Sequence, residues 1–132
     1  MSTVSPERIA LLLRSAVELM NNGGEHWMKG ALKNEVYDME TGDTIPGEFR
    51  YCSLGAIKHV EGFTPIERRA AEEALAESIF ECESDWLEDR FYVLDIGPIA
   101  EGIIFQANDD KNTTWEMVKN WFVVAANRVK TA

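Results

Sequence analysis

The chain has 132 residues, of which 45% are hydrophobic, so it is long enough to form one folded domain with a core. Acidic residues outnumber lysine and arginine by 23 to 13, and the formal net charge is −10. This charge argues against direct binding to nucleic acid or to an anionic membrane surface, because phosphate groups would be repelled. It would suit a basic protein partner.

Targeting and redox signals are weak in this sequence. No apolar run approaches the roughly 20 residues needed to span a bilayer. The start, MSTVSPER, lacks the basic and apolar regions of a signal peptide. The two cysteines, Cys52 and Cys82, are too few for a disulfide framework. We therefore expect a cytoplasmic protein with reduced thiols, folded as a single compact domain over residues 1–132.

The spacing of apolar residues predicts a mostly helical α+β fold with about four helices, at approximately residues 5–22, 52–61, 65–88 and 114–130. Ser5 and Pro6 suit the start of the first helix, and Thr64 to Glu67 forms a capping box for the third. The first helix should bury one stripe of residues, namely Ile9, Leu12, Leu13, Ala16 and Met20.

Two regions lack the helical period. Between the first two helices, Val36, Tyr37 and Ile45 flank the turn Thr41-Gly42-Asp43, which predicts a short, irregular β-hairpin. In the second region, residues 103–105 are expected to form a short strand or an extended core segment. Residues 108–112 are expected to be a loop.

The third helix should bury a stripe formed by Ala71, Leu75, Ile79, Cys82 and Trp86. Between positions 67 and 90 there are nine acidic residues and three arginines, so its outward face should be acidic and solvated. We expect Glu72, Glu73 and Glu77 to be the binding residues of this face. Such a face would attract a basic surface.

The last helix carries a second possible contact. Its buried stripe should be Trp115, Val118, Phe122, Ala125 and Val129. Trp121 lies off that stripe, on a flank with Met117 and Val124. If this flank were exposed, it would form an apolar patch for a partner or for a second copy of the chain.

Catalysis would have to begin at Cys52, whose thiol pKa would be lowered if it sat in the first turn of a helix. His26 and either Asn108 or Asp109 are candidates for the base and the orienting group. His59 is a poor base, because two helical turns separate it from Cys52 by about 10 Å. The competing interpretation is that Cys52 is a small buried core residue, and we favour it.

Metal and cofactor motifs are not evident. The chain contains only four cysteines and histidines, without the spacing of a zinc site. The stretch that begins NDDKNTTWE lacks the glycine at the sixth position of a calcium loop. Counted from Asn108, Lys119 stands where the loop's final glutamate should be. We predict no metal and no cofactor.

Three short motifs are similar to those of a family of small uncharacterised proteins associated with bacteriophages and actinobacteria. They are WMKGAL at 27–32, YCSLGAI at 51–57 and NDDKNTTWE at 108–116. The resemblance brings no activity with it. It implies that seven residues form one connected cluster, either a fold signature or a site: Trp27, Gly30, Cys52, Leu54, Gly55, Asn108 and Asp109.

Taken together, the sequence favours a small acidic, non-catalytic protein that binds a basic or host protein through the acidic face of the third helix. A phage or mobile-element accessory protein acting on a host factor is one form of this hypothesis. One alternative is a cysteine-dependent hydrolase or transferase that uses Cys52. The other is a small-ligand-binding domain with a pocket between the hairpin and the helices.

Overall fold

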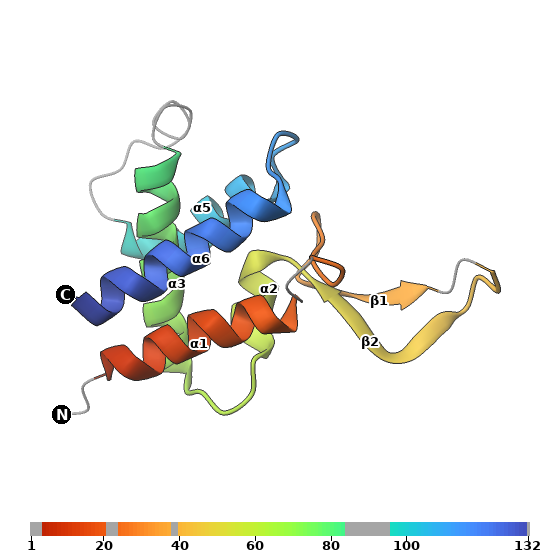
Figure 1. The fold of residues 1–132 in the computed structure, drawn as a ribbon, viewed down its shortest axis with the longest axis horizontal. Coiled ribbons are helices and arrows are strands. Elements are labelled where there is room, and N and C mark those ends of the chain that lie inside the picture. The colour runs from red at the N-terminus through yellow and green to blue at the C-terminus, as the bar shows by residue number, and fades with distance from the viewer. Residues whose placement is uncertain (1–3, 21–23, 38–39, 84–95, 132) are drawn as a thin grey trace.

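The computed structural model describes residues 4–20, 24–37, 40–83 and 96–131, and within them the chain forms five α-helices, one 3-10 turn and a two-stranded sheet. The predicted fold class, mostly helical α+β with a hairpin between the first two helices, is confirmed (Figure 1). In chain order the elements are α1 (Pro6–Leu19), β1 (Lys33–Tyr37), β2 (Thr44–Tyr51), α2 (Ser53–His59), α3 (Pro65–Cys82), η1 (Gly97–Ile99), α5 (Ala100–Asp109) and α6 (Trp115–Thr131).

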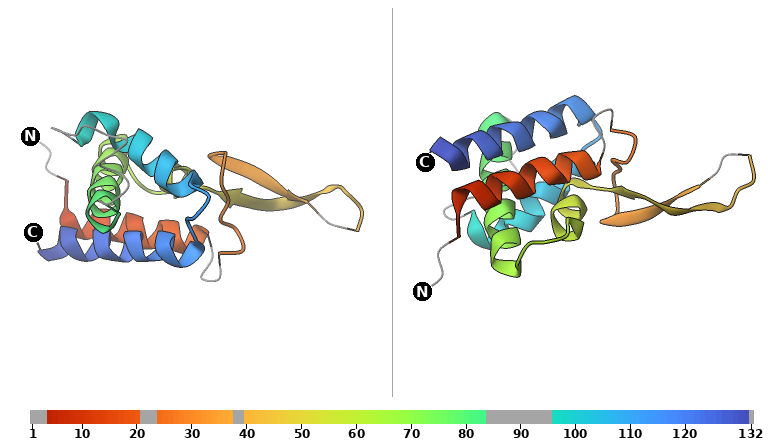
Figure 2. Two further views of the ribbon diagram at one scale, coloured as in Figure 1. Left: turned by 90° about the horizontal axis from the view of Figure 1, so that it is seen from above. Right: turned by 60° about the horizontal axis from the view of Figure 1, so that its bottom comes forward.

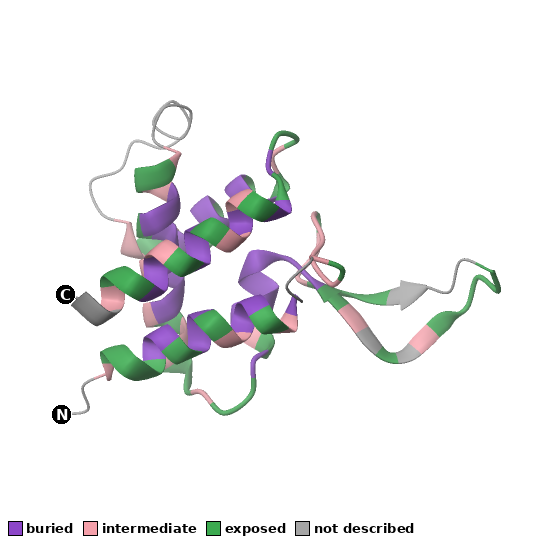
Figure 3. Ribbon diagram, in the orientation of Figure 1, coloured by how far each residue is buried: buried purple, intermediate pink, exposed green. Residues whose placement is uncertain are grey.

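The helices form two layers. α1 and α6 lie side by side and run in opposite directions, and α3 crosses them from behind with α5 and α2 in the same layer (Figures 1 and 2). The predicted stripe of α1 is entirely buried between the layers. Large side chains from both layers fill this core, among them Leu12, Leu75, Ile104 and Phe122. The buried parts of the helices face one another between the layers (Figure 3). Burial of these apolar faces stabilises the helices against one another.

The start of α3 has the capping box that the sequence predicts. Val60 ends α2, and Thr64 begins the next helix, with its hydroxyl accepting from Glu67 N at 3.1 Å. The Glu67 carboxylate accepts from Thr64 N at 2.9 Å, which completes the capping box. α3 is described as far as Cys82, and the predicted extension to residue 88, with Trp86, lies outside the described residues.

Two predictions for this layer were wrong. Residues 103–105 are not a strand but part of α5, which begins after the turn at Pro98 and buries Ile103, Ile104 and Ala107 on one helical face. β-branched residues at 103 and 104 had favoured a strand, and packing against α3 overrides that local preference. Cys82 is exposed, whereas Ile79, three residues earlier on the predicted stripe, is fully buried.

The hairpin stands apart from both layers. β1 and β2 pair antiparallel, with Lys33 opposite Tyr51 and an irregularity between Glu35 and Tyr37. Both figures show this pair projecting beyond the ends of the helices (Figures 1 and 2). We call residues 33–51 the arm.

Candidate functional site

Cys52 is the N-cap of α2 rather than a surface nucleophile. Its side chain is fully buried, and its sulfur accepts a hydrogen bond from Gly55 N at 3.3 Å. Burial raises the pKa of the Cys52 thiol, against the opposing effect of the Gly55 N–H, and the negative charge of Asp109 raises it further. The thiol is therefore protonated near neutral pH and closed to solvent, which is the opposite of what a nucleophile needs.

Among the described contacts, neither histidine pairs with Cys52. His59 Nδ1 lies 2.7 Å from the carbonyl oxygen of Gly55, and the imidazole packs against the ring of Tyr51 at a centroid distance of 5.6 Å. At His26 the backbone carbonyl accepts from Tyr51 N at 2.7 Å, which ties residue 26 to the end of β2. Among the described residues, the one side-chain hydrogen bond of Cys52 is to a backbone amide, so the geometry contains no thiol–imidazole pair.

Asn108 lies at the centre of a buried hydrogen-bond network. Its Oδ1 accepts from Trp27 Nε1 at 2.7 Å, from Ser53 N at 3.0 Å and from Ser53 Oγ at 2.7 Å. Its Nδ2 donates to the carbonyl of Met28 and to Asp109 Oδ1, both at 3.0 Å. Because Asn108 is fully buried, these bonds satisfy groups that would otherwise be costly to bury.

The same network continues to the chain just before the arm. Asp109 Oδ1 accepts from Gly30 N at 2.9 Å, and Lys29 Nζ donates to the carbonyl of Asp110 at 2.7 Å. We call Trp27, Gly30, Ser53, Asn108 and Asp109 the latch. Asn108 and Asp109 were expected in a loop, but they are the last residues of α5, and their side chains reach about 80 positions back along the chain.

The hydrogen bonds of the latch join residues from all three sequence motifs. The first motif leads into β1, the second begins at the end of β2, and the third supplies Asn108 and Asp109. The latch therefore connects both ends of the arm to α5. Trp27, Gly30, Asn108 and Asp109 are joined as the resemblance implied, and Ser53 is a member that sequence reasoning missed.

The arm itself is exposed and anionic. Its described side chains at Lys33, Asn34, Glu35 and positions 40–44 are exposed (Figure 3). Between positions 34 and 49 the sequence has five acidic residues and neither lysine, arginine nor histidine. Cations occur only at its base, where Lys33 Nζ lies 4.0 Å from the ring centroid of Phe49. The sequence of the outer part of the arm therefore has a net negative charge, and the acidic residues Glu35, Glu40 and Asp43 within it are exposed.

Three of the glutamates on the predicted acidic face of α3 lie beside cations from other helices. Arg8 pairs with Glu67 at 2.8 Å, and Arg128 pairs with Glu81 at 2.8 Å. Glu72 is buried, with 7% of its surface exposed, and lies 3.6 Å from Lys58 Nζ. These cations come from α1, α2 and α6, and the spacing within α3 does not reveal them.

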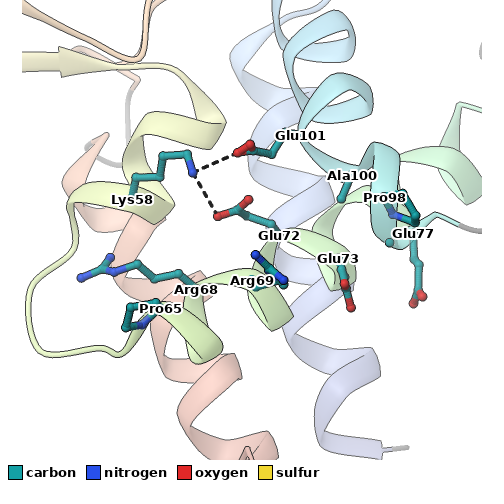
Figure 4. A pocket seen from close by; sticks show the side chains of 11 residues that line it. Lys58, Pro65, Arg68, Arg69, Glu72, Glu73, Glu77, Pro98, Ala100 and Glu101 are labelled. Atoms are coloured by element: carbon teal, nitrogen blue, oxygen red, sulfur yellow. Dashed lines mark ion pairs between the residues drawn. The ribbon is translucent and has the colours of Figure 1, made fainter.

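Even so, the three glutamates expected to bind line one groove. The groove lies between α2, α3 and the start of α5, has a volume of about 780 Å³, and includes Glu72, Glu73 and Glu77 (Figure 4). Lys58 bridges Glu72 and Glu101 across it, the latter at 3.0 Å. Burial raises the pKa of Glu72, and the charge of Lys58 opposes that rise.

Trp121 is not a surface residue. Its side chain is fully buried, and its Nε1 donates to Glu83 Oε2 at 3.3 Å. Met117 and Val124, on the same flank of α6, are half-buried. Trp121 therefore belongs to the core and cannot serve as a contact for a partner or a second copy in the folded protein.

Within the described ranges, no three His, Cys, Asp or Glu side chains gather closely enough to hold a metal ion. Over the same residues, none of the helices has the length and apolar character required to cross a membrane.

The fold and the latch define a mostly helical α+β protein that carries an exposed hairpin arm. The chain belongs to a family of unknown function, DUF6197, whose model matches residues 4–128. No curated protein and no solved structure matches the chain.

Proposed function

We propose that this protein is a non-catalytic binding protein that contacts a basic surface of a partner protein through the outer part of its arm. The observation that carries the proposal is the combination of projection and charge, five carboxylates and no cation between positions 34 and 49, on a hairpin outside the helical layers. Clustered charge of one sign on an exposed element speeds association with a surface of opposite sign.

The way in which the two ends of the arm are attached to the helices supports the same proposal. A two-stranded hairpin is marginal in water on its own, so it keeps its shape only when its ends are fixed. Here the latch and the bridge between Trp27 and Tyr51 fix both ends. An arm held in this way loses little conformational entropy on binding, which favours affinity.

The buried thiol supports a non-catalytic role over the cysteine-dependent alternative. A nucleophile must be reachable by substrate and partly ionised, and Cys52 is closed to solvent with a raised pKa. The phage or mobile-element origin and the action on a host factor stay predictions of the sequence resemblance.

The test compares two variants of identical net charge. The arm variant carries Glu35→Gln, Glu40→Gln and Asp43→Asn, and the control carries Glu18→Gln, Glu61→Gln and Glu116→Gln at exposed helix and loop positions. Each protein is immobilised and used to capture partners from cells that carry the gene, at low and high salt. We expect the arm variant to lose roughly tenfold in affinity for the captured partner, at up to about 1 kcal/mol per lost ion pair.

In that experiment the control variant should bind as the unmodified protein does. Equal losses for both variants would show that only total charge matters. A partner retained by the arm variant and lost by the control would place the contact on the helical body.

A further inference from the structure

The groove beside α3 is distinct from the arm and carries charges of both signs. Its charged lining consists of Lys58, Arg68, Arg69, Glu72, Glu73, Glu77 and Glu101. Its volume of about 780 Å³ lies in the range of ligand pockets. Ligand pockets are usually apolar, however, so this lining selects a charged occupant.

The charges are ordered along the groove. Arg68 and Pro65 lie at one end, and Glu77 and Pro98 lie at the other, with Arg69, Glu72 and Glu73 between them (Figure 4). The order follows from the sequence of α3, because positions 69 and 77 are separated by about 12 Å along a helix. The groove therefore has a cationic end and an anionic end.

The charges of Lys58, Glu72 and Glu101 in the groove already pair with one another. Lys58 contacts the carboxylates of Glu72 and Glu101, at 3.6 and 3.0 Å, and so holds α2, α3 and α5 together. Arg68 donates to the carbonyl of Ile57 at 2.6 Å, which fixes its guanidinium beside α2. These contacts orient the lining without an occupant.

The remaining charges are available. Arg69 and Glu77 are exposed, Glu73 is half-exposed, and none of them makes a hydrogen bond or ion pair with another described residue. A cation and two carboxylates thus face the same groove without a hydrogen bond or ion pair to any described residue, and the charge of Arg69 also acts on the buried carboxylate of Glu72.

We propose that this groove binds a short polypeptide segment of another protein, with an acidic side chain at the Arg68–Arg69 end and a basic side chain at the Glu73–Glu77 end. The separation of the two ends requires charges about 10 Å apart, the length of three extended residues. Side chains three residues apart point to opposite faces of an extended strand, so the segment must turn between them, and glycine residues permit that turn. A free amino acid holds its charges too close together to reach both ends. The segment is held by two ion pairs at partly exposed positions, so a single short peptide binds weakly.

The test uses two capped probe peptides of the same composition. In Ac-GEGGKG-NH2 the charges are three residues apart, and in Ac-GEKGGG-NH2 they are adjacent. Binding is followed by NMR shifts of the backbone amides of α3 and by titration to a dissociation constant. We expect the spaced peptide to shift the amides near Arg69 and Glu77 and to bind roughly three- to fivefold more tightly than the adjacent one.

A substitution that reverses the charge at position 69 makes the test specific to this groove. Arg69→Glu should weaken Ac-GEGGKG-NH2 and strengthen Ac-GKGGKG-NH2, by similar factors. Arg14→Glu, at an exposed position of α1, is the matched control and should change neither ratio. Equal effects of the two substitutions, or equal affinity for the spaced and adjacent peptides, would overturn the proposal. The arm is unaltered in all these proteins, so this result is independent of the arm's role.

Discussion

Gly55 of α2 lies directly against the carbonyl group of Leu32, the residue that precedes β1. A methyl group at position 55 would overlap the carbonyl oxygen, carbon and Cα of Leu32. The same carbonyl accepts from Cys52 N at 3.4 Å. The start of α2 and the root of the arm are therefore in backbone contact, and glycine is what permits it.

Replacing this glycine should destabilise the whole protein. We expect Gly55→Ala to lower the free energy of unfolding by about 2 kcal/mol or more, because the backbone of Leu32 must move. Urea unfolding followed by tryptophan fluorescence measures the change. The matched control is Gly102→Ala, at an exposed position inside α5, which should stabilise by about 0.5–1 kcal/mol. Losses of equal size at both positions would mean that the contact with Leu32 is unimportant.

Asn108 should be the most sensitive residue of the latch. Asn108→Ala leaves the donors of Trp27 and Ser53 and the carbonyl of Met28 without their partner, and we expect a loss of about 3 kcal/mol in the free energy of unfolding. Hydrogen exchange should show the amides of residues 24–32 opening first.

Asn112→Ala is the control for Asn108. Asn112 is exposed, and its substitution should change the stability by less than about 0.5 kcal/mol. If exchange in Asn108→Ala rises uniformly over all the helices, and not first at residues 24–32, the latch does not hold the arm.

The two thiols should differ in reactivity. In the native protein at pH 8, a chromogenic disulfide reagent should label Cys82 and leave Cys52 unreacted, because Cys52 is buried and Cys82 is exposed. Both should react in denaturant, and a Cys82→Ser variant should show no fast native labelling. Rapid labelling of Cys52 in that variant would revive the cysteine-dependent alternative.

Acid should weaken the pair between α1 and α3. The hydrogen bonds and charge of Arg8 lower the pKa of Glu67 from 4.5 to about 2, so the contribution of this carboxylate to stability is present above its unfolded pKa and lost as the pH falls through its folded pKa. The difference in unfolding free energy between the unmodified protein and Glu67→Gln should therefore shrink between about pH 5 and pH 2.

The effect of Glu72 on stability should change with pH in the opposite direction to that of Glu67. Burial raises its pKa, so its ionised form disfavours folding, and Glu72→Gln should gain stability relative to the unmodified protein as the pH rises from the unfolded pKa of this carboxyl through its folded pKa. Parallel pH profiles for the two variants would contradict the assigned environments of both carboxylates.

Sequence periodicity predicted the elements that pack by one stripe. α1 and α6 repeat apolar residues at helical spacing, and the hairpin has turn residues between β-formers, so all three were found. α5 was missed because Gly102 and two isoleucines weaken its helical signal, while burial against α3 decides its conformation. Local preference was outweighed there by tertiary packing.

The site was harder to predict than the fold, because its contacts join distant positions. The motifs containing Trp27 and Asn108 pointed to a cluster, but not to Ser53, whose amide and hydroxyl both reach Asn108. The pairing of Lys58 with Glu72 and Glu101 depends on how three helices cross, which no spacing within one helix encodes. For the same reason the sequence of α3 does not show that Glu67 and Glu81 pair with Arg8 and Arg128.

Site-specific photo-crosslinking from the arm tests the central claim most directly. A benzoyl-phenylalanine replaces Glu40 in the outer part of the arm or, as the control, Glu116 at an exposed position of α6. Irradiation of cells that carry the gene should join position 40 to one basic protein, in a yield that falls as salt is raised after lysis, with no product from position 116. A product from position 116 alone, or none from position 40, would contradict the account.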